Sequence, residues 1–378
     1  MIKIDDKSKC CGCAACVQRC PKQCITMVEG CEGFHYPFVD ADSCIDCGLC
    51  EKVCPMLTQG EQRVPLYTYA AKCTDENIRL KSSSGGLFTL LATETLNRGG
   101  VVFGARFNEQ WEVVHDYCTT VEGLEAFRGS KYVQSRIGDT LSKAEKFLKE
   151  GRDVLFSGTP CQISGLKRFL RREYDNLLTV EVACHGVPSP LVWMRYIEEL
   201  QLSSQEIKNV AFRDKSTGWA NYSFKLDSDR GGVCERFYDN VYMKAFLINV
   251  SLRPSCYNCP AKEHKSGADI MLADLWGASK VIGCDDDDKG VSLVVVNKEN
   301  ILPADKLWLK SIDYQQAIKY NSAIVKSVPL TDKRIVFFAK FANRERLSSI
   351  VAEITRVPTI RKVLSLVKRV IKKIIGRK

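Results

Sequence analysis

The chain has 378 residues, of which 45% are hydrophobic and 26% are charged, so its composition is that of an ordinary globular protein. Its length favours two or three domains. The formal charge of +10 is almost entirely local, because residues 356–378 hold nine Lys or Arg and no acid. The rest of the chain is close to neutral, which argues against a nucleic-acid-binding protein.

Cysteine is unevenly distributed, since 11 of the 19 cysteines fall in the first 54 residues. A disulfide scaffold would need an oxidising compartment. Residues 1–9 are polar, however, and lack the apolar segment of a secretory signal. No apolar run reaches the roughly 18 residues that a membrane span needs. We therefore expect a cytoplasmic protein whose cysteines are metal ligands.

Two similar cysteine motifs lie 34 residues apart in this N-terminal region. They are Cys10-x2-Cys13-x2-Cys16-x3-Cys20-Pro21 and Cys44-x2-Cys47-x2-Cys50-x3-Cys54-Pro55. This is the spacing of ferredoxins with two [4Fe-4S] clusters, in which the last cysteine of each motif binds the cluster of the other motif. The sequence therefore predicts a two-cluster domain over residues 1–58. One cluster would be bound by Cys10, Cys13, Cys16 and Cys54, and the other by Cys44, Cys47, Cys50 and Cys20.

Zinc is the alternative ligand for cysteine pairs of this kind. It does not explain why the same spacing and the following proline occur twice. Cys11 does not fit the spacing and is interpreted as a bystander, and Cys24 and Cys31 are interpreted as small side chains rather than ligands. Residues 25–39 would form a hairpin that packs the two halves of the domain together.

From residue 67 onward, strand and helix patterns alternate. Helices are expected at Leu87–Asn97 and Cys161–Arg172, and strands at Gly99–Phe107, Val154–Ser157, Leu177–Ala183 and Ser292–Asn297. Such alternation predicts an α/β domain with a partly parallel sheet. The chain then ends in helices.

Loops that follow the strands of such a sheet are where ligands bind. The Ser84-Gly85-Gly86 turn precedes a helix whose backbone amides can hold a phosphate, although a plain helix cap is the alternative. At Gly158–Gln162, Thr159 and Pro160 fit a helix start, where the positive field favours the thiolate of Cys161.

Three further cysteines lie in the same part of the chain. Cys184 follows a predicted strand, and Cys256 and Cys259 form a Cys-x2-Cys pair. Together with Cys161 they supply four thiolates, the number that a third cluster needs. Spacing alone does not show that these segments meet in the fold.

Several ordered motifs in this region resemble the family of coenzyme F420 hydrogenase/dehydrogenase beta subunits. They are Ser83–Gly86, Phe127–Ser135, Gly158–Gln162, Cys184–Pro188, Arg253–Cys259 and Asp269–Gly277. The resemblance implies an FAD and a cluster bound by Cys161, Cys184, Cys256 and Cys259. The flavin contacts that it implies are Ser84, Gly85, Gly86, Gly129, Ser130, Lys131, Tyr132, Gln134, Gly158, Thr159, Pro160 and Gln162.

The resemblance also implies an activity. Clusters would pass single electrons to or from the flavin, which would exchange a hydride or an electron pair with an F420-like deazaflavin or with an unknown substrate, such as one of a polysaccharide pathway. Lys131 is the predicted catalytic residue, because a cation at the N1 edge stabilises a reduced flavin; a surface lysine is the alternative. A non-catalytic relay subunit is the alternative to an enzyme. The partner would be a redox protein or a small electron carrier.

The fold class expected for the whole chain is α+β. Residues 1–58 would be the ferredoxin-type domain, 67–140 and 141–330 the two parts of an α/β flavin-binding domain, and 331–378 a helical tail. Within the tail, residues 360–375 place eight apolar side chains on one helical face and basic ones opposite. This pattern suits peripheral contact with an anionic membrane through residues 356–378, and docking onto protein is the alternative.

Overall fold

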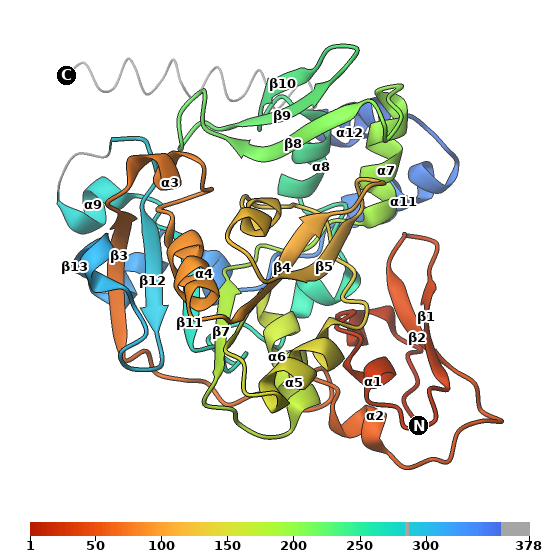
Figure 1. The fold of residues 1–378 in the computed structure, drawn as a ribbon. Coiled ribbons are helices and arrows are strands. Elements are labelled where there is room, and N and C mark those ends of the chain that lie inside the picture. The colour runs from red at the N-terminus through yellow and green to blue at the C-terminus, as the bar shows by residue number, and fades with distance from the viewer. Residues whose placement is uncertain (284–286, 357–378) are drawn as a thin grey trace, which may run out of the picture.

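The structure is a computed structural model that describes residues 1–283 and 287–356. The predicted amphipathic helix at 360–375 lies outside the described residues. Figure 1 shows a small N-terminal domain and a large sheet in the middle of the molecule. A smaller sheet lies above the large sheet and is accompanied by helices. Within the described residues, no helix combines the length and the apolar character needed to cross a bilayer.

The N-terminal domain is built from one antiparallel hairpin and two short helices. Strand β1 (Ile25–Glu29) pairs with β2 (His35–Val39), which confirms the predicted hairpin. Helices α1 (Ala15–Gln18) and α2 (Leu49–Lys52) each begin after a residue in the left-handed conformation, Ala14 (φ 55°) and Gly48 (φ 69°). These sharp turns let each cysteine motif curve around a central space.

The large sheet has eight strands in the order β13-β3-β12-β11-β7-β6-β4-β5. Their bounds are β3 (Tyr67–Cys73), β4 (Val101–Phe107), β5 (Val113–Cys118), β6 (Val154–Gly158), β7 (Leu177–Val182), β11 (Ile270–Asp274), β12 (Ser292–Val296) and β13 (Leu307–Ser311). Strands β4, β6, β7 and β11 are parallel, and the other pairs are antiparallel. The predicted partly parallel sheet is confirmed.

Helices cover both faces of this sheet. Because successive side chains of a strand point to opposite faces, Val101 and Phe103 of β4 pack with α5 (Thr140–Lys149) and α6 (Pro160–Leu170), while Val102 packs with α4 (Leu87–Asn97). Three short helices complete the layers near β3, β11 and β12. They are α3 (Glu76–Leu80), α9 (Ala278–Ile282) and α10 (Tyr314–Ile318).

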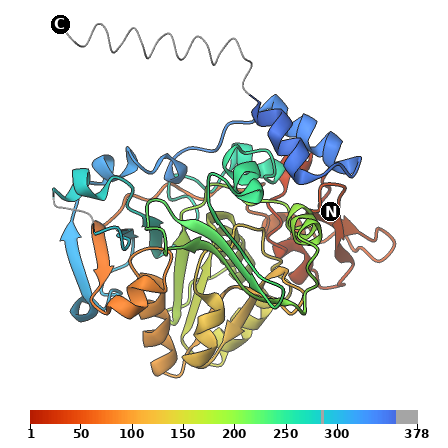
Figure 2. The same cartoon turned by 90° about the horizontal axis from the view of Figure 1, so that it is seen from above.

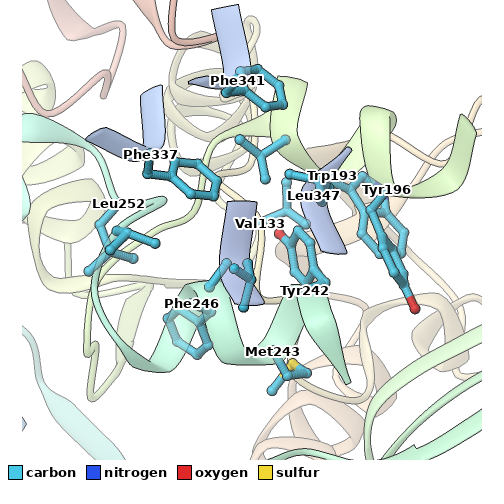
Figure 3. Packing of buried hydrophobic residues seen from close by; sticks show 14 of the residues in the cluster. Val133, Trp193, Tyr196, Tyr242, Met243, Phe246, Leu252, Phe337, Phe341 and Leu347 are labelled. Carbon is cyan, nitrogen blue, oxygen red and sulfur yellow. The ribbon is translucent and has the colours of Figure 1, made fainter. Parts of the chain in front are cut away.

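The upper part of the molecule has its own core. It contains an antiparallel sheet and four helices, namely β8 (Ile207–Asp214), β9 (Ser223–Ser228), β10 (Val233–Arg236), α7 (Pro190–Glu199), α8 (Val241–Leu247), α11 (Asp332–Ala342) and α12 (Leu347–Thr355). In Figure 3, Trp193 of α7, Tyr242 and Phe246 of α8, and Phe337 and Phe341 of α11 pack together. Helices α11 and α12 therefore each contribute one face to a buried core.

This helical layer also touches the ferredoxin domain. Arg334 of α11 forms an ion pair with Glu32 in the loop between β1 and β2. Figure 2 shows α11 and α12 on the same side of the molecule as the N-terminal domain. The ferredoxin domain thus packs against the body, through this ion pair and through contacts of α1 with α5 and α6.

Candidate iron-sulfur and flavin sites

The first ferredoxin site is a hollow lined by the four cysteines that the spacing assigns to one cluster, Cys10, Cys13, Cys16 and Cys54. All four side chains are buried. Apolar residues complete the wall, among them Ile2, Met27 and Met56. An all-thiol donor set in an apolar shell fits a [4Fe-4S] cluster.

The second ferredoxin site is lined by the other predicted set, Cys20, Cys44, Cys47 and Cys50. It is closer to solvent than the first site, because Cys47 is exposed and Cys20 and Cys44 are half-buried. Cys24 also lines this hollow and lies 3.4 Å from Cys20, sulfur to sulfur. Cys20 from the first motif and Cys44, Cys47 and Cys50 from the second are the set that fits a cluster here.

A third thiol-lined hollow lies in the body, where the structure brings Cys161, Cys184, Cys256 and Cys259 together. Cys161 follows β6 at the start of α6, and Cys184 follows the neighbouring parallel strand β7. Cys256 lies in a 3-10 turn at Pro254–Asn258, and Cys259 follows it directly. The site is therefore at the carboxyl edge of the parallel strands, where open α/β sheets bind ligands.

The size of this hollow fits a group like those of the ferredoxin sites. Its empty volume, including space open to solvent, is about 440 Å³, against about 330 Å³ and 340 Å³ for the first and second sites. Among residues 1–283 and 287–356, no three His, Cys, Asp or Glu side chains gather as the ligands of one metal ion would. Thiols arranged around a space suit a cubane, which places its own iron and sulfide between them.

Cys11 was interpreted as a bystander to the cluster ligands, and the structure places it beside the third set of cysteines. Its side chain is buried in the wall of the third hollow and contacts Cys161. Cys10, the preceding residue, lines the first hollow. The spacing of cysteines within one motif could not predict this position, because the Cys11 thiol faces the body and not its own motif.

Burial dominates the chemistry of these thiols. It raises the pKa of Cys16 to about 12, of Cys256 to about 12 and of Cys259 to about 11. The helix start was expected to favour the thiolate of Cys161, but contact with Cys11, together with burial, holds its pKa well above the usual range. Iron would therefore bind with release of protons from these thiols.

The Ser83–Gly86 turn is closely packed against strand ends of the large sheet. A Cβ at Gly85 would lie 2.4 Å from the carbonyl oxygen of Ala71, so no side chain fits there. The Gly85 N–H donates to Ser292 Oγ (2.9 Å), and the Ser130 N–H donates to Ser83 Oγ (2.8 Å). Helix α4 begins with Gly86 as its N-cap, with no side chain capping the first amides.

The other predicted flavin contacts follow from residue 129 to residue 162. Lys131 Nζ donates to the carbonyls of Ala126 (2.9 Å) and Arg128 (2.8 Å), and desolvation lowers its pKa to about 7. The ring of Tyr132 stacks on Phe246 at a centroid distance of 4.7 Å.

Gln134 and Gln162, like Ser130 and Lys131, have hydrogen-bond partners within the protein. Gln134 Nε2 donates to the carbonyl of Cys11 (2.9 Å), at the contact between the ferredoxin domain and the body. Gln162 is buried, and its amide bonds to Ser135 Oγ (2.8 Å) and to the Thr159 N–H (2.9 Å).

Two cations near the Ser83–Gly86 turn were not found from the sequence. Arg213, at the end of β8, is buried and donates from Nη1 to Asp274 (2.6 Å) and to Tyr132 Oη (3.3 Å), while its Nε and Nη2 have no hydrogen-bond partner among the described residues. Lys215 Nζ donates to the carbonyl of Ser84 (3.0 Å). Arg213 and Lys215 belong to no recognisable sequence motif, so their position near this turn is known only from the fold.

Three hollows lined with cysteine, two in a small N-terminal domain and one at the carboxyl edge of a mixed sheet, define an iron-sulfur electron-transfer protein. The chain belongs to the family of coenzyme F420 hydrogenase/dehydrogenase beta subunits. Models of these beta subunits match residues 68–142 (N-terminal part) and 151–309 (C terminus), and residues 9–57 match a 4Fe-4S dicluster domain.

Curated relatives include a reductase and a subunit of a dehydrogenase. Coenzyme F420-dependent sulfite reductase of Methanocaldococcus jannaschii is 26% identical over 206 residues, covering 52% of this chain and 30% of that protein. One subunit of the F(420)H(2) dehydrogenase of Methanosarcina mazei is 26% identical over 165 residues, covering 40% and 46%. The chain thus spans less than half the length of either relative.

Two further similarities concern parts of the fold. A 7Fe ferredoxin of Hydrogenibacillus schlegelii is 49% identical over 43 residues, covering 11% of this chain and 49% of that protein. A chain of the F420-reducing [NiFe] hydrogenase complex from Methanosarcina barkeri is similar with a TM-score of 0.46 and 18% identity, over 68% of this chain and 90% of that chain.

Proposed function

We propose that this protein is a flavin- and iron-sulfur-dependent oxidoreductase. The carrying observation is the third thiol site, which lies at the ligand-binding edge of the sheet and shares a wall with the ferredoxin domain through Cys11. Clusters bound at the three sites would carry single electrons, and an FAD would exchange a hydride or an electron pair with the substrate. Cys161, Cys184, Cys256 and Cys259 would bind the third cluster.

The burial of the sites supports an order of electron transfer. The second site is the more exposed of the two ferredoxin sites, with Cys47 at the surface, so a redox partner or a small carrier would meet the protein there. The first site is buried and adjoins the third through the consecutive residues Cys10 and Cys11. Electrons would therefore pass between the surface and the body through the second, first and third sites in turn.

Placement of the FAD is proposed from three features near the carboxyl edge. The first amides of α4 have no capping side chain and would bind a phosphate at the Ser84–Gly86 turn. Ser130 lies beside that turn. Arg213 is a buried cation whose Nε and Nη2 have no partner among the described residues. Lys131, whose pKa burial lowers to about 7, is the residue predicted to stabilise negative charge on a reduced flavin when it is protonated.

The substrate is proposed from the family. Relatives named for coenzyme F420 suggest a deazaflavin as the partner in two-electron exchange. An unknown compound, such as one of a polysaccharide pathway, is the other proposed class, because a shared fold fixes the cofactors better than the substrate. We also propose a cytoplasmic location, with residues 356–378 in contact with an anionic membrane surface.

A relay subunit is the second candidate function. It is favoured by one observation, the exposed Cys47 at the second site, together with the dehydrogenase subunit among the relatives. Purification without oxygen separates the two candidates. An oxidoreductase should release one FAD per chain on denaturation and, once reduced, pass electron pairs to coenzyme F420 or another two-electron acceptor. A protein that holds iron but no flavin would be a relay.

A further inference from the structure

Four arginines are buried in the described part of the chain: Arg79, Arg213, Arg253 and Arg334. Three of them are paired with carboxylates, since Arg79 binds Asp287 (2.5 Å), Arg213 binds Asp274 (2.6 Å) and Arg334 binds Glu32. Arg253 is the most deeply buried, at 1% exposure. Within residues 1–283 and 287–356, it has no carboxylate within ion-pair distance.

Arg253 lies between the two adjoining cysteine sites and contacts the first of them directly. Its Nη2 donates to Cys10 Sγ (3.4 Å) and to the His35 carbonyl (2.9 Å), and its Nε donates to the Cys10 carbonyl (2.7 Å). Its Nη1 donates to Gln134 Oε1 (2.8 Å), and its guanidinium lies 4.5 Å from the centroid of the Tyr36 ring. The side chain also lines the third hollow.

A buried charge without a partner is costly, so buried ions in proteins are paired or bind metals. Neutral carbonyls and a ring satisfy the donors of Arg253 but do not balance its charge. Four thiolates around a [4Fe-4S] core give the cluster a net negative charge, which increases when it takes up an electron. An anionic group at Cys10 would supply the missing countercharge at hydrogen-bond distance.

We propose that Arg253 is the counter-cation of the cluster bound through Cys10 and sets its reduction potential. The fixed positive charge stabilises the reduced cluster more than the oxidised one, which raises the potential. The step is a one-electron transfer in which no bond forms or breaks and Arg253 keeps its protons. Arg253 also lines the third hollow. Its charge therefore favours the reduced state of the clusters at the junction between the ferredoxin domain and the body.

This inference rests on the proposed function only for the third cluster, since the first cluster belongs to the ferredoxin domain. The experiment is an anoxic redox titration of full-length protein, followed by electron paramagnetic resonance, for wild type, Arg253→Met, Arg253→Lys and Arg334→Met. Arg253→Met should lower the reduction equilibrium constant of one ferredoxin-domain cluster at least tenfold, about 59 mV for a one-electron couple. Arg253→Lys should restore much of the loss.

Arg334→Met is the control, because it removes another buried arginine, one that has its own carboxylate. It should cost stability and leave the potentials unchanged. If Arg253→Met does not fold, wild-type protein made with ¹⁵N-arginine decides the question. Pulsed resonance should then show a ¹⁵N coupling to one reduced cluster, and Arg253→Lys should abolish it.

Unchanged potentials in Arg253→Met with full iron content would overturn the proposal. So would equal shifts of both ferredoxin-domain clusters, or the absence of a ¹⁵N coupling in wild type. Failure of the third cluster is recognised separately, because the iron content would then be about eight atoms per chain while the effect on the Cys10 cluster persisted.

Discussion

Gly165 of α6 and Cys13 of the ferredoxin domain approach so closely that a Cβ at residue 165 would lie 2.7 Å from Cys13 Cβ and 3.1 Å from its sulfur. Gly165 is thus a contact point between the body and the first cluster site. In a helix, Gly→Ala is normally stabilising by roughly 0.5–1 kcal/mol. Here we expect the opposite sign, because the added methyl group must push the cysteine loop away.

The measurement for Gly165→Ala is chemical denaturation of the anoxic full-length protein, with hydrogen exchange over residues 10–16. We expect a lower free energy of unfolding and faster exchange in that loop. A variant that is more stable than wild type, with unchanged exchange, would show that the ferredoxin domain does not dock on α6 in this way.

Cys256→Ala should remove about four irons and leave about eight, because each cluster needs all four thiolates. Cys161→Ala should have the same effect. The matched control is Cys234→Ala, which removes an exposed cysteine that lines none of the three hollows. Iron and sulfide are counted per chain after anoxic purification. Equal iron in Cys256→Ala and Cys234→Ala would rule out the third cluster.

Cys11→Ala tests the five-thiol wall of the third site. We expect it to keep the full iron content of about twelve atoms, because four other cysteines supply the ligands of that cluster. Iron per chain is measured in Cys11→Ala and in Cys161→Ala, and the two values are compared. Loss of about four irons on removal of Cys11 would make it a ligand in place of one of the four.

His115 should make stability depend on pH. It is buried between Ser135 Oγ (2.8 Å) and the Ser157 carbonyl (3.0 Å), and burial lowers its pKa from 6.5 to about 4. Between these values the unfolded chain binds a proton that the folded chain does not, so stability falls as the pH falls from 6.5 toward 4. The full effect is roughly 3 kcal/mol, and above pH 6.5 this group contributes no dependence.

The free energy of unfolding of wild type and His115→Asn should therefore be compared at pH 7.5, 6.5 and 5.5. The variant is expected to be less stable at pH 7.5 and to show a flatter pH dependence. Identical slopes in the two proteins would mean that His115 is not kept neutral by the fold.

The basic C-terminal segment should bind anionic vesicles. Residues 356–378 carry nine Lys or Arg, and each basic group near such a surface contributes on the order of 1 kcal/mol. Sedimentation should show binding at low salt and release at high salt. The truncated control should end at Arg356. A shorter version would lose part of α12, which contributes the buried Ile350, Val351 and Ile354. Equal sedimentation of both forms would point to a protein-docking role.

Local sequence patterns were enough to predict the ferredoxin domain and four of the eight strands of the large sheet, namely β4, β6, β7 and β12. The two cysteine motifs predicted the two sets of four cysteines that line the ferredoxin hollows, and helix α4 (Leu87–Asn97) has the predicted bounds. Strand β6 was also recognised from its apolar run, because a strand buried on both faces needs apolar side chains at every position.

The surroundings of the sites, in contrast, depend on how distant segments pack. Arg253 reaches Cys10, a residue 243 positions earlier in the chain, and Cys11 turns toward Cys161. Neither contact has a spacing that could reveal it, since each depends on how the ferredoxin domain packs on α6 and on the turn at Pro254–Asn258. Residue spacing reports ligands that share one loop, whereas the charges and thiols that join two sites are set by the packing of separate segments.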